Sequence, residues 1–184
     1  MSSLSNSRVE SQRFSVIGAQ NVSRMCLVCG VENAFGLKGR FFVADCRRLV
    51  GVFWPREEHQ SYPGRLHGGV ISAILDETIG RAINLAGGET WGVTVEFEVK
   101  FRRAVPLDRP VTAVAWITRD RGRVFEGAGE IVLEDGEIAA TGSGRYLKMR
   151  LEQITSPEFL GKEWFSDPDP VPAEIMVGKR AESK

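Results

Sequence analysis

The sequence has no excess of charge of either sign, because Lys plus Arg number 24 and Asp plus Glu also number 24. A basic excess is typical of nucleic-acid-binding proteins, and a block of like charge is typical of an electrostatic membrane patch. The sequence also lacks an apolar run of the roughly 18 residues that a membrane span needs. Residues 1–14 lack the apolar core of a signal peptide. We therefore expect a cytoplasmic protein that binds neither nucleic acid nor a membrane.

Cysteine and histidine are scarce. The three cysteines, Cys26, Cys29 and Cys46, cannot build a disulfide framework. Cys26 and Cys29 form a CxxC, which is half of a zinc site, but His59 and His67 are the only histidines and no second CxxC follows. We expect no metal site, and we interpret the cysteine pair as free thiols in a turn.

The length of 184 residues is enough for one domain with a proper core. Residues 1–22 are Ser-rich and weakly patterned, so we expect a flexible leader there. Residues 151–184 are rich in proline and suggest an appended C-terminal arm. The domain itself is expected to span residues 23–150.

The most informative stretch is LHGGVISAILDETIGRAINLA, residues 66–86, which predicts a helix of about five turns. Its apolar residues recur at the spacing of one buried helix face: Ile71, Ile74, Leu75, Thr78, Ile79, Ala82 and Leu85. The opposite face carries small residues around one acid: Gly69, Ala73, Asp76, Gly80 and Asn84. Solvated helix faces usually carry Lys, Glu and Gln. A substrate chain or a second subunit is therefore expected to approach this face closely.

Two strands are predicted before the helix, within residues 36–55, and four after it. The first of these four, residues 90–105, alternates apolar and polar residues with a period of two. The others are predicted at residues 111–120, 124–135 and 136–150, with a hairpin turn at Asp135-Gly136. The fold class is therefore α+β: a curled antiparallel sheet of about six strands wrapped around one long central helix.

Three segments carry a resemblance to a known family: CLVCGVENAFGL (26–37), LHGGVISAILDE (66–77) and VTVEFEVKFRRAVP (93–106). Together they resemble the hotdog-fold acyl-CoA thioesterases, in the phenylacetate-pathway and 4-hydroxybenzoyl-CoA thioesterase-like branch. The resemblance covers about residues 26–149. It implies hydrolysis of an acyl-CoA thioester to the free acid and CoA, without a cofactor, because CoA is part of the substrate. It also implies a homodimer, with two dimers often forming a homotetramer.

The resemblance also implies roles for single residues. Asp76 matches the helix carboxylate that acts as nucleophile or as general base on water, and Thr94 matches a hydroxyl that holds that water. His67 and Gly68 match the loop that lines the thioester. Gly69 matches the amide that polarises the thioester carbonyl. The working site is implied to form between two subunits, with the acid from one and the glycine loop from the other.

Elementary chemistry agrees with these roles. Unpaired amides at a helix N-terminus can stabilise the negative charge that develops on an attacked carbonyl oxygen. An aspartate with a pKa of about 3.9 is a poor base at neutral pH, but burial would raise that pKa. Glu77 is the fallback base or a substrate contact, with a solvated position as the alternative. Arg102 and Arg103 end a strand and are candidates to bind the CoA phosphates, with a solvated rim as the alternative.

Two other functions compete with hydrolysis. Hotdog dehydratases that act on acyl-carrier substrates carry a His-x-Pro-Gly loop, and a Glu follows about fourteen residues beyond the His. Here Gln60 and Ser61 follow His59, and Ala73 stands fourteen residues on, which argues against dehydration. The remaining alternative is a non-catalytic protein that binds acyl-CoA and regulates a partner.

The sequence does not identify the acyl group. Trp54, Trp91 and Trp116 suggest an apolar or aromatic pocket, but packing in the core explains them equally well.

Overall fold

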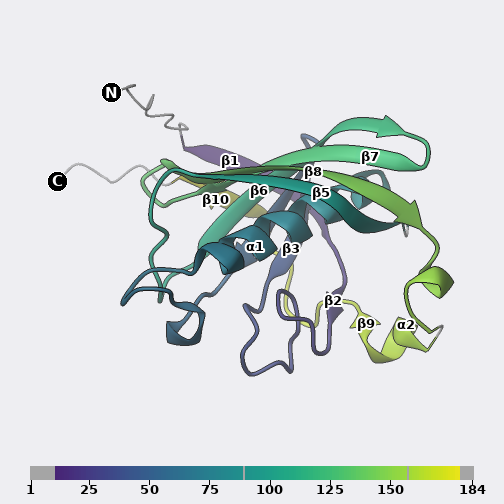
Figure 1. Ribbon diagram of the computed structural model, residues 1–184, viewed down its shortest axis with the longest axis horizontal. Helices are drawn as coiled ribbons and strands as arrows, with labels where there is room; N and C mark the ends of the chain where they lie inside the picture. The colour runs from purple at the N-terminus through teal and green to yellow at the C-terminus, as the bar shows by residue number, and fades with distance from the viewer. Residues whose placement is uncertain (1–10, 89, 157, 179–184) are drawn as a thin grey trace.

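A computed structural model describes residues 11–88, 90–156 and 158–178 of the chain (Figure 1). Its main layer is an eight-stranded antiparallel sheet in the order β10-β1-β3-β4-β6-β7-β8-β5. The strands are β1 Gln12–Ala19, β3 Arg40–Ala44, β4 Arg48–Phe53, β5 Trp91–Phe101, β6 Val111–Arg121, β7 Val124–Val132, β8 Ile138–Met149 and β10 Glu174–Val177. The short strands β2 (Val22–Ser23) and β9 (Trp164–Phe165) form a second antiparallel pair.

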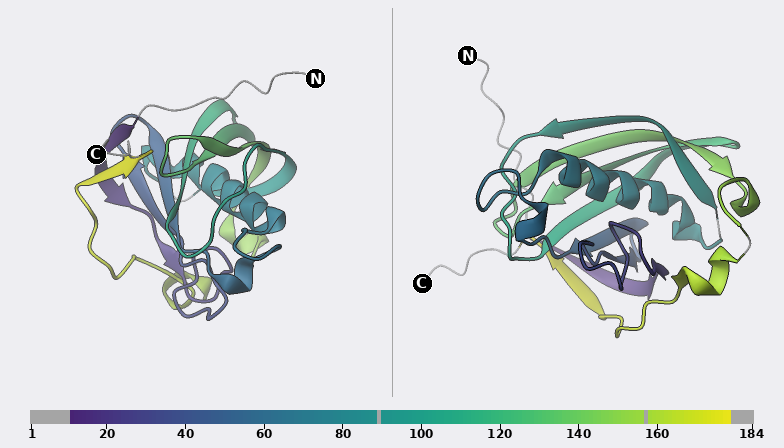
Figure 2. Two further views of the ribbon diagram at one scale, coloured as in Figure 1. Left: turned by 90° about the vertical axis from the view of Figure 1, so that its left-hand side faces the viewer. Right: turned by 60° about the horizontal axis from the view of Figure 1, so that its bottom comes forward.

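The predicted central helix is confirmed. It consists of α1 (Gly68–Arg81), continued by the 3-10 segment η2 (Ala82–Ala86), and it lies against one face of the sheet, in contact with β4 to β8 (Figures 1 and 2). His67 is the N-cap, because its ring nitrogen accepts a hydrogen bond from the Gly69 amide. The predicted apolar face is the face that packs against the sheet, with Ile74, Leu75 and Ile79 fully buried.

The contact between helix and sheet is set by glycines beneath Ile79. A Cβ atom added to Gly127 would lie 2.7 Å from Ile79, and one added to Gly129 would lie 3.0 Å from it. A Cβ atom on Gly142 would lie 3.3 Å from the same side chain. These glycines on β7 and β8 form a hollow that receives Ile79 and lets the helix approach the strands closely.

The remaining elements are short: η1 (Glu57–His59) before the helix, and η3 (Leu151–Gln153) and α2 (Phe159–Lys162) after β8. The segment after β8 runs past the C-terminal end of η2 and returns to the sheet as β10 (Figures 1 and 2). None of the described helices is long and apolar enough to cross a membrane.

The predicted sheet of about six curled strands is wrong in number and in shape. The sheet has eight strands, and it is open, because its edge strands β10 and β5 do not pair with each other. The two additional strands, β1 and β10, pair with each other and lie in the segments that the sequence analysis interpreted as leader and arm. Their signal in the sequence is weak, since Phe14 is the only buried residue of β1 and Val177 is the only buried residue of β10. The part of the predicted leader before residue 11 lies outside the described residues, and the division of the chain at residues 22 and 150 stays a prediction.

Candidate active site

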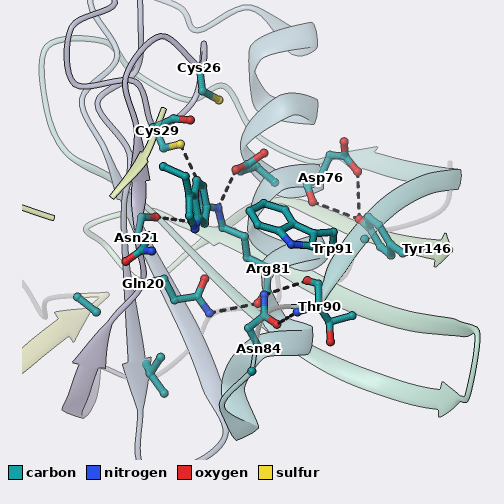
Figure 3. Close-up of a pocket in the computed structure, with 18 of the residues that line it drawn as sticks. Gln20, Asn21, Cys26, Cys29, Asp76, Arg81, Asn84, Thr90, Trp91 and Tyr146 are labelled. Atoms are coloured by element: carbon teal, nitrogen blue, oxygen red, sulfur yellow. Dashed lines mark hydrogen bonds and ion pairs between the residues drawn. The ribbon is translucent and has the colours of Figure 1, made fainter. Parts of the chain in front are cut away.

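A cavity of about 500 Å³ lies along the C-terminal half of α1 and along η2 (Figure 3). The helix contributes Asp76, Glu77, Gly80, Arg81 and Asn84, most of them from the small-residue face. The other walls come from the start of β5, the N-terminal segment around residues 19–29, and the segment after β8. The volume is within the range of small-molecule pockets.

Asp76 is held by two hydroxyl groups from neighbouring strands. The Thr94 hydroxyl on β5 donates to Asp76 Oδ1 at 2.9 Å, and the Tyr146 hydroxyl on β8 lies 3.1 Å from the same oxygen. Thr94 and Tyr146 are cross-strand partners in the β5–β8 ladder, so the sheet register places both beneath the carboxylate. Among the described residues, no donor contacts the second oxygen, Oδ2. That oxygen is therefore the one available to a water or a substrate.

The electrostatic environment favours a basic carboxylate. Burial raises the pKa of Asp76 from its ordinary value, the hydrogen bonds from Thr94 and Tyr146 act in the opposite direction, and the charge of Glu77 raises it further. Burial, together with the adjacent Asp76 charge, also raises the pKa of Tyr146, so its hydroxyl stays protonated and remains a donor. Asp76 is therefore more basic than an exposed aspartate.

The structure brings Thr94 to Asp76 but not the predicted glycine loop. The Gly69 amide donates to His67 Nδ1 at 2.9 Å, so within one copy of the chain it is occupied by the exposed His67 ring. Gly69 lies seven residues before Asp76, which is about 10 Å along the helix axis. Gly68 lies against the Phe101 ring, at the far end of β5. His67, Gly68 and Gly69 therefore do not line the cavity that holds Asp76 in the same copy.

The other predicted substrate contacts lie in different places. Glu77 lines the cavity, but it forms an ion pair with Arg81 at 2.7 Å. Arg102 and Arg103 are exposed beyond the end of β5, and Arg103 forms an ion pair with Glu137. Eight residues of extended strand separate Thr94 from Arg102, or about 26 Å. Both arginines are therefore remote from the cavity of their own copy.

Two important cavity residues were not predicted. Tyr146 was inside a predicted strand without a role, although the alternation Gly142, Gly144, Tyr146 places it on the face that meets the helix. Arg81 is 7% exposed and donates to the Asn21 carbonyl oxygen at 2.8 Å and to Cys29 Sγ at 3.0 Å. Its position four residues after Glu77 is the spacing of a helical ion pair and was the available signal.

Of the three tryptophans that suggested an apolar pocket, Trp54, Trp91 and Trp116, only Trp91 lines the cavity. Trp91 lines the cavity together with Trp164, and their rings are 5.2 Å apart in an edge-to-face arrangement. Phe159 joins them, with its ring centroid 5.6 Å from that of Trp91. Trp116 instead lies beneath the Arg48 guanidinium, and Trp54 is partly exposed outside the cavity lining.

One group of side chains has the composition of a metal site. The donor atoms of Cys26, Cys29 and Glu77 all lie within 4.8 Å of one another. However, the Arg81 guanidinium already binds two of these three donors, Cys29 and Glu77. A cation is thus built into the cluster, and a divalent metal would have to bind next to it. The arrangement does not favour a metal ion.

The fold and the site together define a class of protein: a hotdog-type α+β domain with one long helix on an antiparallel sheet and a basic helix carboxylate in a cavity. Comparison with known proteins narrows this class. Residues 63–140 match the family model of the Thioesterase superfamily. A solved thioesterase superfamily protein is similar with a TM-score of 0.62 and 29% identity, covering 68% of this chain and 61% of that chain. These matches confirm the predicted resemblance to the hotdog-fold thioesterases.

Curated relatives are more distant. The human acyl-coenzyme A thioesterase THEM5 is 25% identical over 114 residues, which is 61% of this chain and 45% of the human protein. The bovine acyl-coenzyme A thioesterase THEM4 is 25% identical over 129 residues, covering 69% of this chain and 52% of the bovine protein. The chain therefore spans about half the length of these relatives. The E. coli PaaI protein of the phenylacetic acid degradation operon shares the fold, with a TM-score of 0.56 at 18% identity, covering 62% of this chain and 81% of that one.

The hydrogen bond from Tyr146 to Asp76 gives a testable prediction. Tyr146→Phe removes a donor that stabilises the charged carboxylate, so the pKa of Asp76 is expected to rise further. The measurement is an NMR titration of the Asp76 carboxyl carbon in both proteins. Tyr62→Phe is the control, because Tyr62 is 76% exposed and outside the cavity. An unchanged or lower pKa in Tyr146→Phe would show that the two groups are not hydrogen-bonded in solution.

Proposed function

We propose that this protein hydrolyses an acyl-CoA thioester to a free acid and CoA, without a further cofactor. The observation that carries the proposal is the Asp76 carboxylate, held by Thr94 and Tyr146 at the wall of a cavity, with a pKa raised by burial. The match of residues 63–140 to the Thioesterase superfamily supports it. The human and bovine relatives are acyl-coenzyme A thioesterases, and this similarity supports acyl-CoA as the substrate class.

In this mechanism Asp76 Oδ2 takes a proton from a water molecule as that water attacks the thioester carbonyl carbon. The Thr94 hydroxyl donates to Oδ1, and its own lone pairs are free to accept a hydrogen bond from the water. Tyr146 fixes the orientation of the carboxylate. The tetrahedral intermediate then expels the CoA thiolate, and the proton held by Asp76 is available to neutralise it. The products are the carboxylic acid and CoA.

Among the described residues, the predicted donors of the glycine loop, Gly68 and Gly69, do not line the cavity that holds Asp76, so the developing oxyanion needs a donor from elsewhere. The second copy of a homodimer can supply it through β5, an edge strand with Val93, Val95 and Phe101 exposed. Suppose that two β5 strands pair antiparallel about an axis near residues 97–98. Phe101 of one copy then lies opposite Thr94 of the other.

That register has a direct consequence for the site. Gly68 packs against Phe101, so the N-terminus of α1 in one copy would approach Asp76 of the other. The Gly69 amide becomes available there if the His67 ring turns away. Arg102 would approach the second cavity for the same reason. We therefore propose a site shared between two subunits, in a homodimer or a dimer of dimers.

The role of Asp76 predicts a large loss of activity in Asp76→Asn. Removal of a general base costs typically about 10²–10⁴-fold in rate, whereas Glu77→Gln, which alters the neighbouring acid, is expected to keep more activity. The measurement is thiol release from a panel of short, medium, long and aryl acyl-CoAs. Equal activity of Asp76→Asn and the parent would refute the mechanism. Tight acyl-CoA binding by calorimetry without turnover of any substrate would instead favour a non-catalytic acyl-CoA-binding protein.

The shared site predicts that assembly and activity are lost together. A charge at the β5 edge, Val95→Lys, is expected to convert the parent dimer or tetramer to monomers, because it opposes strand pairing. Ile17→Lys is the matched control, since Ile17 is 67% exposed but lies on β1, inside the sheet. Sedimentation equilibrium and thiol release measure the two effects. A parent that is monomeric at assay concentration and fully active would exclude the shared site.

The aromatic cluster Trp91, Phe159 and Trp164 closes part of the cavity and is expected to limit the length of the acyl chain. Trp164→Ala enlarges this region, so the preferred acyl chain should become longer, with a several-fold gain for long over short chains. Trp164→Phe should restore the parent preference. Trp116→Ala removes a tryptophan away from the cavity and should leave the preference unchanged. An identical chain-length profile in Trp164→Ala would place the acyl chain elsewhere.

A further inference from the structure

Cys26 and Cys29 lie in a tight turn beside the cavity, and the proposed hydrolysis does not use them. The turn is closed by a hydrogen bond from the Gly30 amide to the Cys26 carbonyl oxygen at 2.9 Å. A Cβ atom on Gly30 would lie 2.3 Å from that oxygen, so the turn depends on glycine at this position. The two Sγ atoms lie within 4.8 Å of each other. A disulfide bond of about 2.05 Å therefore requires side-chain rotation but no large change of the backbone.

The two thiols have different environments. Cys26 is half-buried at the cavity wall, and its Sγ accepts a hydrogen bond from the Val28 amide at 3.3 Å. A hydrogen bond from the Cys29 thiol lowers the pKa of Cys26 to about 6. Cys29 is 1% exposed, and its hydrogen bond to Cys26 together with burial raises its pKa. Cys26 is thus the nucleophile that a reagent in the cavity meets, with a protonated thiol behind it.

We propose that Cys26 and Cys29 form a redox-active dithiol that opens onto the substrate cavity and exchanges with small disulfides. In the first step the Cys26 thiolate attacks one sulfur of a low-molecular-weight disulfide, forms a mixed disulfide and releases one thiolate. In the second step the Cys29 thiol loses its proton and attacks Cys26 Sγ. The second small thiolate leaves and takes that proton. Overall, two protein thiols are oxidised to one disulfide, and one small disulfide is reduced to two thiols.

Arg81 connects this pair to the rest of the cavity. Its guanidinium donates to Cys29 Sγ at 3.0 Å, and it also binds Glu77 and the Asn21 carbonyl oxygen. The positive charge next to Cys29 assists its deprotonation in the second step. It also disfavours the competing interpretation of the cluster as a metal site, because a divalent cation would face the guanidinium.

The experiment treats the reduced protein with oxidised glutathione, quenches it with an alkylating agent and digests it with trypsin. Cleavage after Arg24 and Lys38 gives the peptide 25–38, which contains both cysteines, and cleavage after Arg40 and Arg47 isolates the exposed Cys46 as an internal reference. The peptide 25–38 should become two hydrogens lighter, resist alkylation and recover after reduction. At pH 7 it should react at least about ten-fold faster than the peptide of Cys46, because the lowered pKa of Cys26 makes its thiolate available and Cys29 lies beside it.

Single variants in a Cys46→Ser background separate the two steps. Cys29→Ser should stop at a mixed disulfide, with one glutathione on Cys26, and Cys26→Ser should react at least ten-fold more slowly. These readouts are independent of thioester turnover, so they stand or fall separately from the proposed hydrolysis. A stable mixed disulfide on Cys26 in the protein that keeps both cysteines would overturn the proposal. Stoichiometric zinc in the purified protein, with thiols that react only after chelation, would overturn it in favour of a metal site.

Discussion

The close approach of α1 to the sheet is the constraint on which the rest of the site depends. Ile79 fits a hollow lined by Gly127, Gly129 and Gly142, and a larger residue at any of these positions would push the helix outward. Interiors are packed closely enough that such a shift propagates to neighbouring side chains. Three residues before Ile79 the helix carries Asp76. Its carboxylate reaches the hydroxyls of Thr94 and Tyr146 only because the helix lies so close to β5 and β8.

A second interaction joins the parts of the chain that form the cavity. The buried Arg81 guanidinium contacts Glu77 on its own helix, the Asn21 carbonyl oxygen in the N-terminal segment and the Trp164 ring, whose centroid is 4.6 Å away. It also lies over Phe41 at 4.1 Å. Desolvating a charge is costly, and a carboxylate, a carbonyl group and two aromatic faces offset that cost here. The cavity therefore has three walls that are far apart in sequence but meet at one side chain.

The sequence predicted the parts of the fold that have a regular pattern. The helix within residues 66–86 was identified because it buries one periodic face. The strand within residues 90–105 was identified from its alternation of apolar and polar residues, although none of its side chains is buried within one copy of the chain. β1 and β10 were not predicted, because they pair with each other across most of the length of the chain and no local sequence pattern reports that pairing. The family resemblance pointed to both Asp76 and Thr94, and the structure places them within hydrogen-bond distance, while their catalytic roles stay a proposal. Tyr146 and Trp164 were missed, because their positions depend on strand register and on the return of the C-terminal segment.

The residues on the small-residue face of α1 are explained by two different requirements, packing and cavity lining, and the sequence pattern alone does not distinguish them. Gly80 is a packing residue, because a Cβ atom there would lie 3.2 Å from the Tyr146 ring. Asp76 and Asn84, by contrast, line open space.

The Asp76 carboxylate reduces the stability of the fold. Because its pKa is raised above the value in the unfolded chain, it lowers the free energy of unfolding at every pH above the unfolded pKa. Among the described residues, no Lys or Arg pairs with Asp76 to offset this. Asparagine would accept the same two hydrogen bonds without the charge. This cost in stability agrees with the catalytic role proposed for Asp76.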